Sequence, residues 1–176
     1  MVTIIFEAHA TSLDNEADLA SGHNDVALSK LGIKQAKELG ERYAGQHFDA
    51  IFCSDLQRSY KTAEIAFSNQ FPIIKDARLR ECDYGDLTQK PKELVSVEKP
   101  KRISQPFPNG ESYEQCCERM RLFLNDLKQK YDSKTVMIIG HRATQYGLET
   151  ILNNIPSAKA VTAPWHWQPG WIYKML

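Results

Sequence analysis

Residues 135–141, which read TVMIIGH, decide the fold class of this chain. Thr135–Ile139 is a short apolar run, and such a run is typical of a strand buried on both faces of a sheet. Residues Arg142–Leu152 follow it directly and are predicted to form a helix. Because buried strands that alternate with helices are typical of parallel sheets covered by helices, this stretch predicts an α/β domain.

The same alternation of strand and helix patterns extends in both directions from this stretch. Further strands are predicted at Val2–Phe6, Asp49–Cys53, Pro72–Lys75 and Trp171–Met175. Helices are predicted from Ser29 to about Ala44, from Ser54 to about Phe67, and from Ser112 to about Tyr131. Ser54 with Gln57, and Ser112 with Gln115, have the spacing of a capping box. We expect one domain over residues 1–176, with a mainly parallel central sheet flanked by helices.

Composition and charge exclude several classes of protein. The chain has 22 Lys and Arg against 22 Asp and Glu, which does not suggest a nucleic-acid partner. It has no apolar stretch long enough for a membrane span. Residues 1–12 lack a cationic segment and have only a short apolar run, so we do not expect them to act as a signal peptide. The four cysteines do not have the spacing of a zinc site or a disulfide framework. We therefore expect a reduced, cytoplasmic protein without a metal.

Three predicted strands end in polar side chains that could carry chemistry. Val2–Phe6 leads to His9, the Asp49–Cys53 strand leads to Ser54 and then Arg58, and Thr135–Ile139 leads to His141. Ligands of open parallel sheets bind beyond the carboxyl ends of the strands, so these side chains are expected to share one pocket. A helix that begins near Ser54 would add free N–H groups, which favour an anion.

Two histidines, an arginine and a helix N-terminus make a plausible phosphate site. A neutral imidazole can attack phosphorus, and the phosphohistidine formed can be hydrolysed or passed on. Phosphoryl transfer also needs cationic donors around the equatorial oxygens, and the planar guanidinium of arginine suits that task. The leaving alkoxide needs a proton, which a carboxyl group can supply.

At this point the sequence resembles a known family, the histidine phosphatase superfamily in its phosphoglycerate-mutase-like branch, over nearly its full length. The resemblance rests on six segments in the family's order: IIFEAHATSLDNE, SGHNDVALSKLGIKQAKELGERY, SDLQRSYKTAE, LRECDYGDL, PNGESYEQCCERM and VMIIGHRAT. It implies a three-layer sandwich with a mainly parallel sheet between helices.

The resemblance also implies roles for individual residues. His9 resembles the phosphorylated nucleophile, and Glu81 resembles the proton donor, although Asp83 and Asp86 lie close to it in sequence. His141 resembles the second histidine, which contacts the transferred phosphoryl group. Further phosphate contacts are implied for Arg58 and Asn15.

One departure from the family pattern lies beside the nucleophile. The family has Arg-His-Gly where this chain has Ala8, His9 and Ala10. Loss of one guanidinium from a phosphate pocket would lower the rate by about 10²–10³, by analogy with removal of a charge-stabilising donor. Because an arginine follows the other histidine, we expect Arg142 to reach into the pocket and replace the missing charge, although a plain surface role for it stays open.

Four functions remain open at this level. The leading one is a phosphomonoester phosphatase that needs no metal or other cofactor and acts on a small phosphorylated substrate. The alternatives are a phosphoglycerate-mutase-type phosphotransferase, a non-catalytic phosphate-binding relative and, less supported, a metal-dependent hydrolase. Neither the substrate nor the oligomeric state is readable from the sequence.

Residues 90–108 are predicted to form an irregular excursion that acts as a lid or wall of the site. Its cations could attract a second acidic group of the substrate or could simply keep the loop soluble: Lys90, Lys92, Lys99, Lys101 and Arg102. His23 is expected at the surface, and Trp165, Trp167 and Trp171 are expected to pack against the edge of the sheet.

Overall fold

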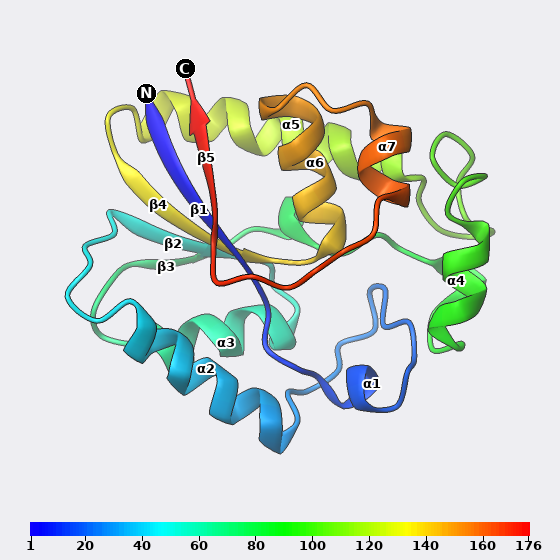
Figure 1. The fold of residues 1–176 in the computed structure, drawn as a ribbon, viewed down its shortest axis with the longest axis horizontal. Coiled ribbons are helices and arrows are strands. Elements are labelled where there is room, and N and C mark those ends of the chain that lie inside the picture. The colour runs from blue at the N-terminus through cyan, green and yellow to red at the C-terminus, as the bar shows by residue number, and fades with distance from the viewer.

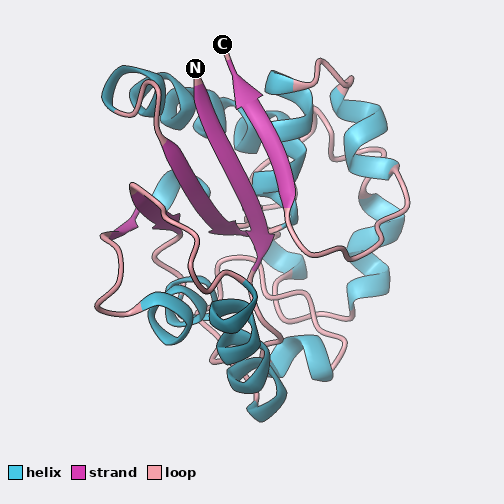
Figure 2. Cartoon of the chain, turned by 60° about the vertical axis from the view of Figure 1, so that its left-hand side comes forward, coloured by secondary structure: helices cyan, strands magenta, loops and turns pink.

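The computed structural model describes residues 1–176, and its centre is a five-stranded sheet (Figures 1 and 2). The strands are β1 (Val2–Ala8), β2 (Ala50–Cys53), β3 (Ile73–Lys75), β4 (Thr135–Gly140) and β5 (Trp171–Met175). Their order across the sheet is β3-β2-β4-β1-β5. All neighbouring pairs are parallel except β1 and β5, which are antiparallel.

Helices cover both faces of this sheet, which confirms the predicted three-layer α/β fold. In Figure 1, α2 and α3 lie on one side of the sheet and α5 and α6 on the other. The helices are α1 (Leu13–Glu16), α2 (Lys30–Arg42), α3 (Gln57–Phe67), α4 (Lys92–Glu98), α5 (Tyr113–Lys130), α6 (Arg142–Leu152) and α7 (Ser157–Thr162). Two 3₁₀ turns lie at Ala77–Leu79 and Gly85–Leu87.

Strand β4 is apolar throughout because it is covered on both faces. Val136 and Ile138 pack in one cluster with side chains of α5, whereas Met137 and Ile139 pack in another with side chains of α2 and α3. All four are fully buried. Successive side chains of a strand point to opposite faces, so a central strand between two helical layers needs an unbroken apolar run.

The start of helix α3 differs from its prediction. Helix α3 begins at Gln57 after Leu56, with no side-chain cap, so Ser54 does not form a capping box. The Gln57 N–H donates to the Asp25 carboxylate at 2.7 Å, so the first N–H of this helix is not free for a ligand. In contrast, the capping box of Ser112 and Gln115 is confirmed.

The excursion over residues 90–108 is more regular than its sequence indicates. It contains helix α4, and beneath it Val95 and Phe107 pack with Tyr84 and Tyr113 in a third apolar cluster. This cluster anchors α4, which lies at the right-hand edge of the molecule in Figure 1.

Two further sequence features have structural outcomes. The four cysteines are buried and unpaired, as expected. None of the helices combines the length and the apolar character that crossing a bilayer would require.

Candidate active site

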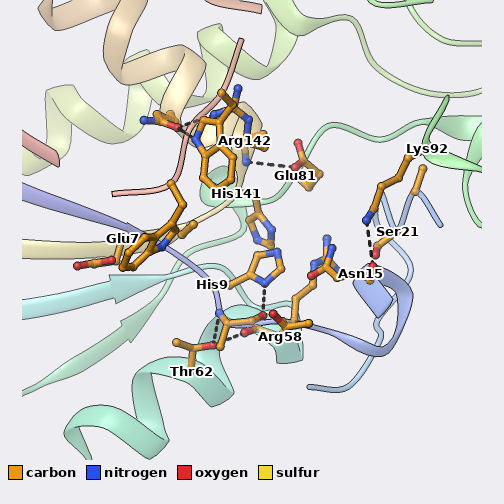
Figure 3. Close-up of a pocket in the computed structure, with 18 of the residues that line it drawn as sticks. Glu7, His9, Asn15, Ser21, Arg58, Thr62, Glu81, Lys92, His141 and Arg142 are labelled. Carbon is orange, nitrogen blue, oxygen red and sulfur yellow. Dashed lines mark hydrogen bonds between the residues drawn. The ribbon is translucent and has the colours of Figure 1, made fainter. Parts of the chain in front are cut away.

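A single large pocket lies where β1 and β4 end, and it brings the six predicted site residues together. Its volume is about 720 Å³. Its lining includes His9, Asn15, Arg58, Glu81, His141 and Arg142 (Figure 3). The register of β1 on β4 explains the meeting of the two histidines, because Ala8 lies opposite Gly140 and each histidine is the next residue.

Hydrogen bonds to the backbone set the orientation of the His9 ring. Its Nδ1 lies 2.7 Å from the Ala10 carbonyl oxygen, which can only accept, so Nδ1 carries the proton. The turn itself is held because the Ala10 N–H donates to Thr62 Oγ1 on α3 at 3.1 Å. This tautomer leaves a lone pair on His9 Nε2, which is the form that a nucleophilic imidazole requires.

His141 lies against His9, with a ring-centroid distance of 5.0 Å (Figure 3). Its Nε2 is 2.7 Å from Ser54 Oγ, whereas its buried Nδ1 has no hydrogen-bond partner. Ser54 Oγ also accepts the Leu56 N–H at 3.3 Å, so the backbone at the start of α3 fixes the serine that holds His141. The His141 ring is thereby fixed against the nucleophile.

Arg58 is the buried cation of the site. It is only 1% exposed and donates to two backbone carbonyls, those of Asn24 at 2.9 Å and Gly22 at 2.7 Å. It has no carboxylate within salt-bridge distance. The positive charge of Arg58 therefore acts on the pocket without a direct counter-ion.

Burial and the charge of Arg58 keep both imidazoles neutral. Burial, with a smaller effect from the Arg58 guanidinium, lowers the pKa of His9 to about 3. The same two causes, in the same order, lower the pKa of His141 well below its usual range. Neutral imidazoles at ordinary pH are consistent with a nucleophile that is ready to attack.

The low pKa of His9 predicts a specific dependence of stability on pH. Between its folded pKa of about 3 and the usual value of about 6.5, the unfolded chain binds a proton that the folded chain does not. The free energy of unfolding should therefore fall as pH drops below about 6.5. Between about pH 6 and 5, wild type should lose about 1 kcal/mol more than His9→Gln. Urea unfolding at several pH values measures this difference.

The control for this measurement is His47→Gln, because His47 is exposed and lies outside the pocket. That variant should keep the pH dependence of wild type. Parallel stability curves for wild type and His9→Gln would show that His9 titrates normally in the folded protein.

Glu81 is held by backbone N–H groups at the start of α6. Its carboxylate accepts hydrogen bonds from the N–H groups of Cys82, Arg142 and Ala143 at 2.8, 3.2 and 3.1 Å. The His23 ring donates to the Glu81 carbonyl oxygen at 2.8 Å, so His23 is not a simple surface residue but supports this loop.

Of the three acidic side chains considered from the sequence, only Glu81 lines the pocket. Asp83 accepts the Gly85 N–H, and Asp86 accepts from the Asn109 side chain. Asn15 also lines the pocket, and its Oδ1 accepts the Ser12 N–H in the cap of α1.

Arg142 lines the pocket but is not bonded to either histidine. Its guanidinium donates to Gln145 Oε1 at 2.9 Å and to Tyr146 Oη at 3.3 Å. It also lies 4.9 Å from the ring centroids of both Tyr146 and Trp165. In Figure 3, His141 lies between Arg142 and His9. The geometry gives no support to the prediction that Arg142 replaces the charge missing at Ala8.

Sequence reasoning missed several residues that line the pocket. Trp165 and Trp167 form part of its wall, a role that the expected packing against the sheet edge does not include. Trp165 does stack on Trp171, and its indole N–H donates to Gln145. Of the five excursion cations considered from the sequence, Lys92 and Lys99 line the pocket. The aromatic tail and the lysine-rich excursion were visible in the sequence, but nothing there showed which members face the site.

Comparison with known proteins agrees with this geometry. The sequence pattern of the histidine phosphatase superfamily (branch 1) matches residues 4–166. The chain belongs to the histidine phosphatase superfamily. The predicted family is thereby confirmed.

The length of the matched segment differs from one member of the superfamily to another. Phosphoserine phosphatase 1 of Hydrogenobacter thermophilus is 31% identical over 170 residues, covering 90% of this chain and 80% of that protein. A 2,3-bisphosphoglycerate-dependent phosphoglycerate mutase of Streptococcus uberis is 42% identical over 98 residues, covering 52% and 43%. The solved structure of Bacillus stearothermophilus YhfR has the same fold, with a TM-score of 0.87 at 23% identity, covering 98% of this chain and 90% of that one.

Proposed function

We propose that this histidine phosphatase superfamily member is a phosphomonoester phosphatase that acts through a phosphohistidine on His9. The observation that carries the proposal is the arrangement of His9 itself. Its Nδ1 is bonded to the Ala10 carbonyl, its Nε2 keeps a lone pair, and His141 and Arg58 lie beside it in the same pocket. A nucleophile next to cationic and neutral donors is the requirement of phosphoryl transfer.

The reaction proceeds in two steps. In the first, His9 Nε2 forms a bond to phosphorus while the bond from phosphorus to the alcohol oxygen breaks, and a protonated Glu81 gives its proton to that oxygen. In the second, a water oxygen forms a bond to phosphorus while the bond from phosphorus to His9 Nε2 breaks, Glu81 takes a proton from that water, and inorganic phosphate leaves. Arg58 and His141, which lie beside His9 in the pocket, stabilise the charge on the phosphoryl oxygens in both steps.

None of these steps requires a metal ion. The one group of three donor side chains close enough to share an ion, Cys82, Glu111 and Cys116, lies outside the pocket lining. Its Glu111 carboxylate is already paired with Arg119 at 2.8 Å. The four free, buried cysteines also support a reducing compartment such as the cytoplasm as the place of action.

Release of phosphate from p-nitrophenyl phosphate between about pH 5 and 8 tests the proposed activity. We expect turnover that is unchanged by an excess of EDTA, because the nucleophile and the charge-stabilising groups are all side chains. Activity that EDTA removes and a divalent cation restores would contradict a metal-independent mechanism. No release from any phosphomonoester would favour the non-catalytic, phosphate-binding alternative.

A mutase activity is the second candidate, and the partial match to phosphoglycerate mutases is the reason to test it. The longer match, over 80% of a relative, is to a protein named as a phosphatase. Incubation with 3-phosphoglycerate and a trace of 2,3-bisphosphoglycerate separates the two. A phosphatase should release inorganic phosphate, whereas a mutase should form 2-phosphoglycerate without net release.

A further inference from the structure

The structure sorts the five cations of the excursion into different roles. Lys90 and Lys101 are exposed and lie outside the pocket lining. Arg102 is paired with Glu98 at 2.6 Å. Only Lys92 and Lys99 line the pocket.

The two lysines that line the pocket differ in their partners. The Lys92 ammonium lies 3.4 Å from the Asp18 carboxylate and donates to the Asn15 carbonyl at 3.1 Å (Figure 3). Lys99 has no carboxylate within 4.0 Å, and its Nζ donates instead to the neutral hydroxyl of Tyr146 at 3.0 Å. Lys99 is therefore a pocket cation without a counter-ion.

Arg142, at the start of α6, donates to the same Tyr146 hydroxyl. Its guanidinium lies 3.3 Å from Tyr146 Oη and has no carboxylate within 4.0 Å either. Two unpaired cations from α6 and from the end of α4 thus donate to one oxygen atom. Because like charges repel, an arrangement of this kind is stabilised when an anion binds between or beside them.

The Arg142 guanidinium is also held in place before any ligand arrives. It lies 4.9 Å from the ring centroids of Trp165 and Tyr146, and Gln145 accepts one of its N–H groups. Tyr146 itself is only 2% exposed, so the oxygen shared by both cations is fixed as well. Such preorganised donors bind an anion with little loss of side-chain entropy.

We propose that Lys99 and Arg142 form a second anion subsite of the pocket, separate from the phosphoryl position at His9 and His141. Resting on the proposed phosphatase function, this subsite assigns the substrate to the phosphomonoesters whose alcohol part carries a further acidic group, a carboxylate or a second phosphate. It also gives Arg142 a role that does not require contact with His9, namely recognition of the leaving group.

Hydrolysis of matched substrates tests the subsite. Propyl phosphate, 3-phosphonooxypropanoate and propane-1,3-diyl bisphosphate share a three-carbon chain and differ in the group at its far end. Homologues with two to five carbons vary the spacing. We expect kcat/KM to be at least about tenfold higher for one acidic series than for the alkyl phosphates, since a charge-assisted hydrogen bond contributes about that much. The better of the two acidic series identifies the carboxylate or the phosphate.

Two variants and one control connect any preference to the proposed residues. Lys99→Met and Arg142→Met should each reduce the ratio of kcat/KM between the acidic and alkyl substrates by about tenfold. Lys101→Met removes an exposed lysine outside the pocket and should leave that ratio unchanged. Equal kcat/KM for acidic and alkyl substrates at every chain length, or a ratio that survives both variants, would overturn the subsite.

Calorimetric binding keeps the subsite testable even if the proposed catalysis fails. 4-Phosphonobutanoate and butylphosphonate are matched analogues whose carbon–phosphorus bond is not hydrolysed, and 1,4-butanediylbisphosphonate supplies the second phosphate-like arm. Tighter binding of either acidic analogue, by about tenfold and lost in Lys99→Met, supports the subsite without any turnover. Equal dissociation constants for all three, with turnover of p-nitrophenyl phosphate intact, would refute the subsite alone.

Discussion

Replacement of His9 by alanine is expected to abolish phosphate release, with kcat lowered by at least about 10⁴-fold. The two nearest alternatives are already engaged, because His141 Nε2 is bonded to Ser54 and Glu81 accepts from three backbone N–H groups. Acid-labile, base-stable phosphate should be trapped on wild type after rapid quenching with labelled substrate. None should be found on His9→Ala.

The matched control for that experiment is His47→Ala, which removes an exposed histidine outside the pocket. Its turnover and its trapped label should equal those of wild type. Label that persists on His9→Ala would place the nucleophile elsewhere, and turnover without any trapped label in wild type would argue against a phosphohistidine.

Replacement of Arg58 by methionine is expected to lower kcat/KM by about 10²–10³, because it removes the buried cation beside the phosphoryl position. The position of Arg58 makes this effect large, since Ala8 supplies no second guanidinium next to His9. The same variant should raise the pKa of His9 above about 3, since the charge of Arg58 helps to lower it. Steady-state kinetics and an NMR titration of the histidines measure the two effects.

Because Arg58 also donates to the carbonyls of Gly22 and Asn24, its loss can disturb the fold. Arg58→Lys keeps the charge without the planar fork, and it should hold the pKa of His9 low while still reducing kcat/KM. Arg121→Met removes an exposed arginine and serves as the control for charge. Full activity in a folded Arg58→Met protein would exclude a role in catalysis.

The sequence alone predicts that residues at the ends of two strands form the site. His9 and His141 each follow an apolar run that packs as a parallel strand, and parallel strands bring their carboxyl ends to one edge. Glu81 follows no strand directly, and two other acidic residues, Asp83 and Asp86, follow it within five positions. Glu81 is the acidic residue of the site because its carboxylate contacts the start of α6. That contact joins segments distant in sequence and is set by the tertiary packing.

For Arg142, the sequence suggests a position that the structure does not support. Its neighbour in sequence is His141, and this proximity led to the expectation of a contact with the phosphoryl group at His9. In α6 the side chain of Arg142 instead lies near residues three and four positions further on, Gln145 and Tyr146, and against Trp165 from the end of the chain. Adjacent residues at a helix start point in different directions, so sequence neighbours need not serve the same part of a pocket.

The sequence by itself determined the α/β fold, because local apolar patterns predict its strands and helices, and it placed the two histidines at the carboxyl ends of strands. Six motif segments in the family's order indicated the family. The tertiary structure decided which carboxylate meets the start of α6, which excursion lysines line the pocket, and that Lys99 and Arg142 share the Tyr146 hydroxyl. Those contacts join side chains from elements far apart in the chain. They depend on how α4, α6 and the tryptophan segment pack around the sheet edge, and no local pattern encodes that packing.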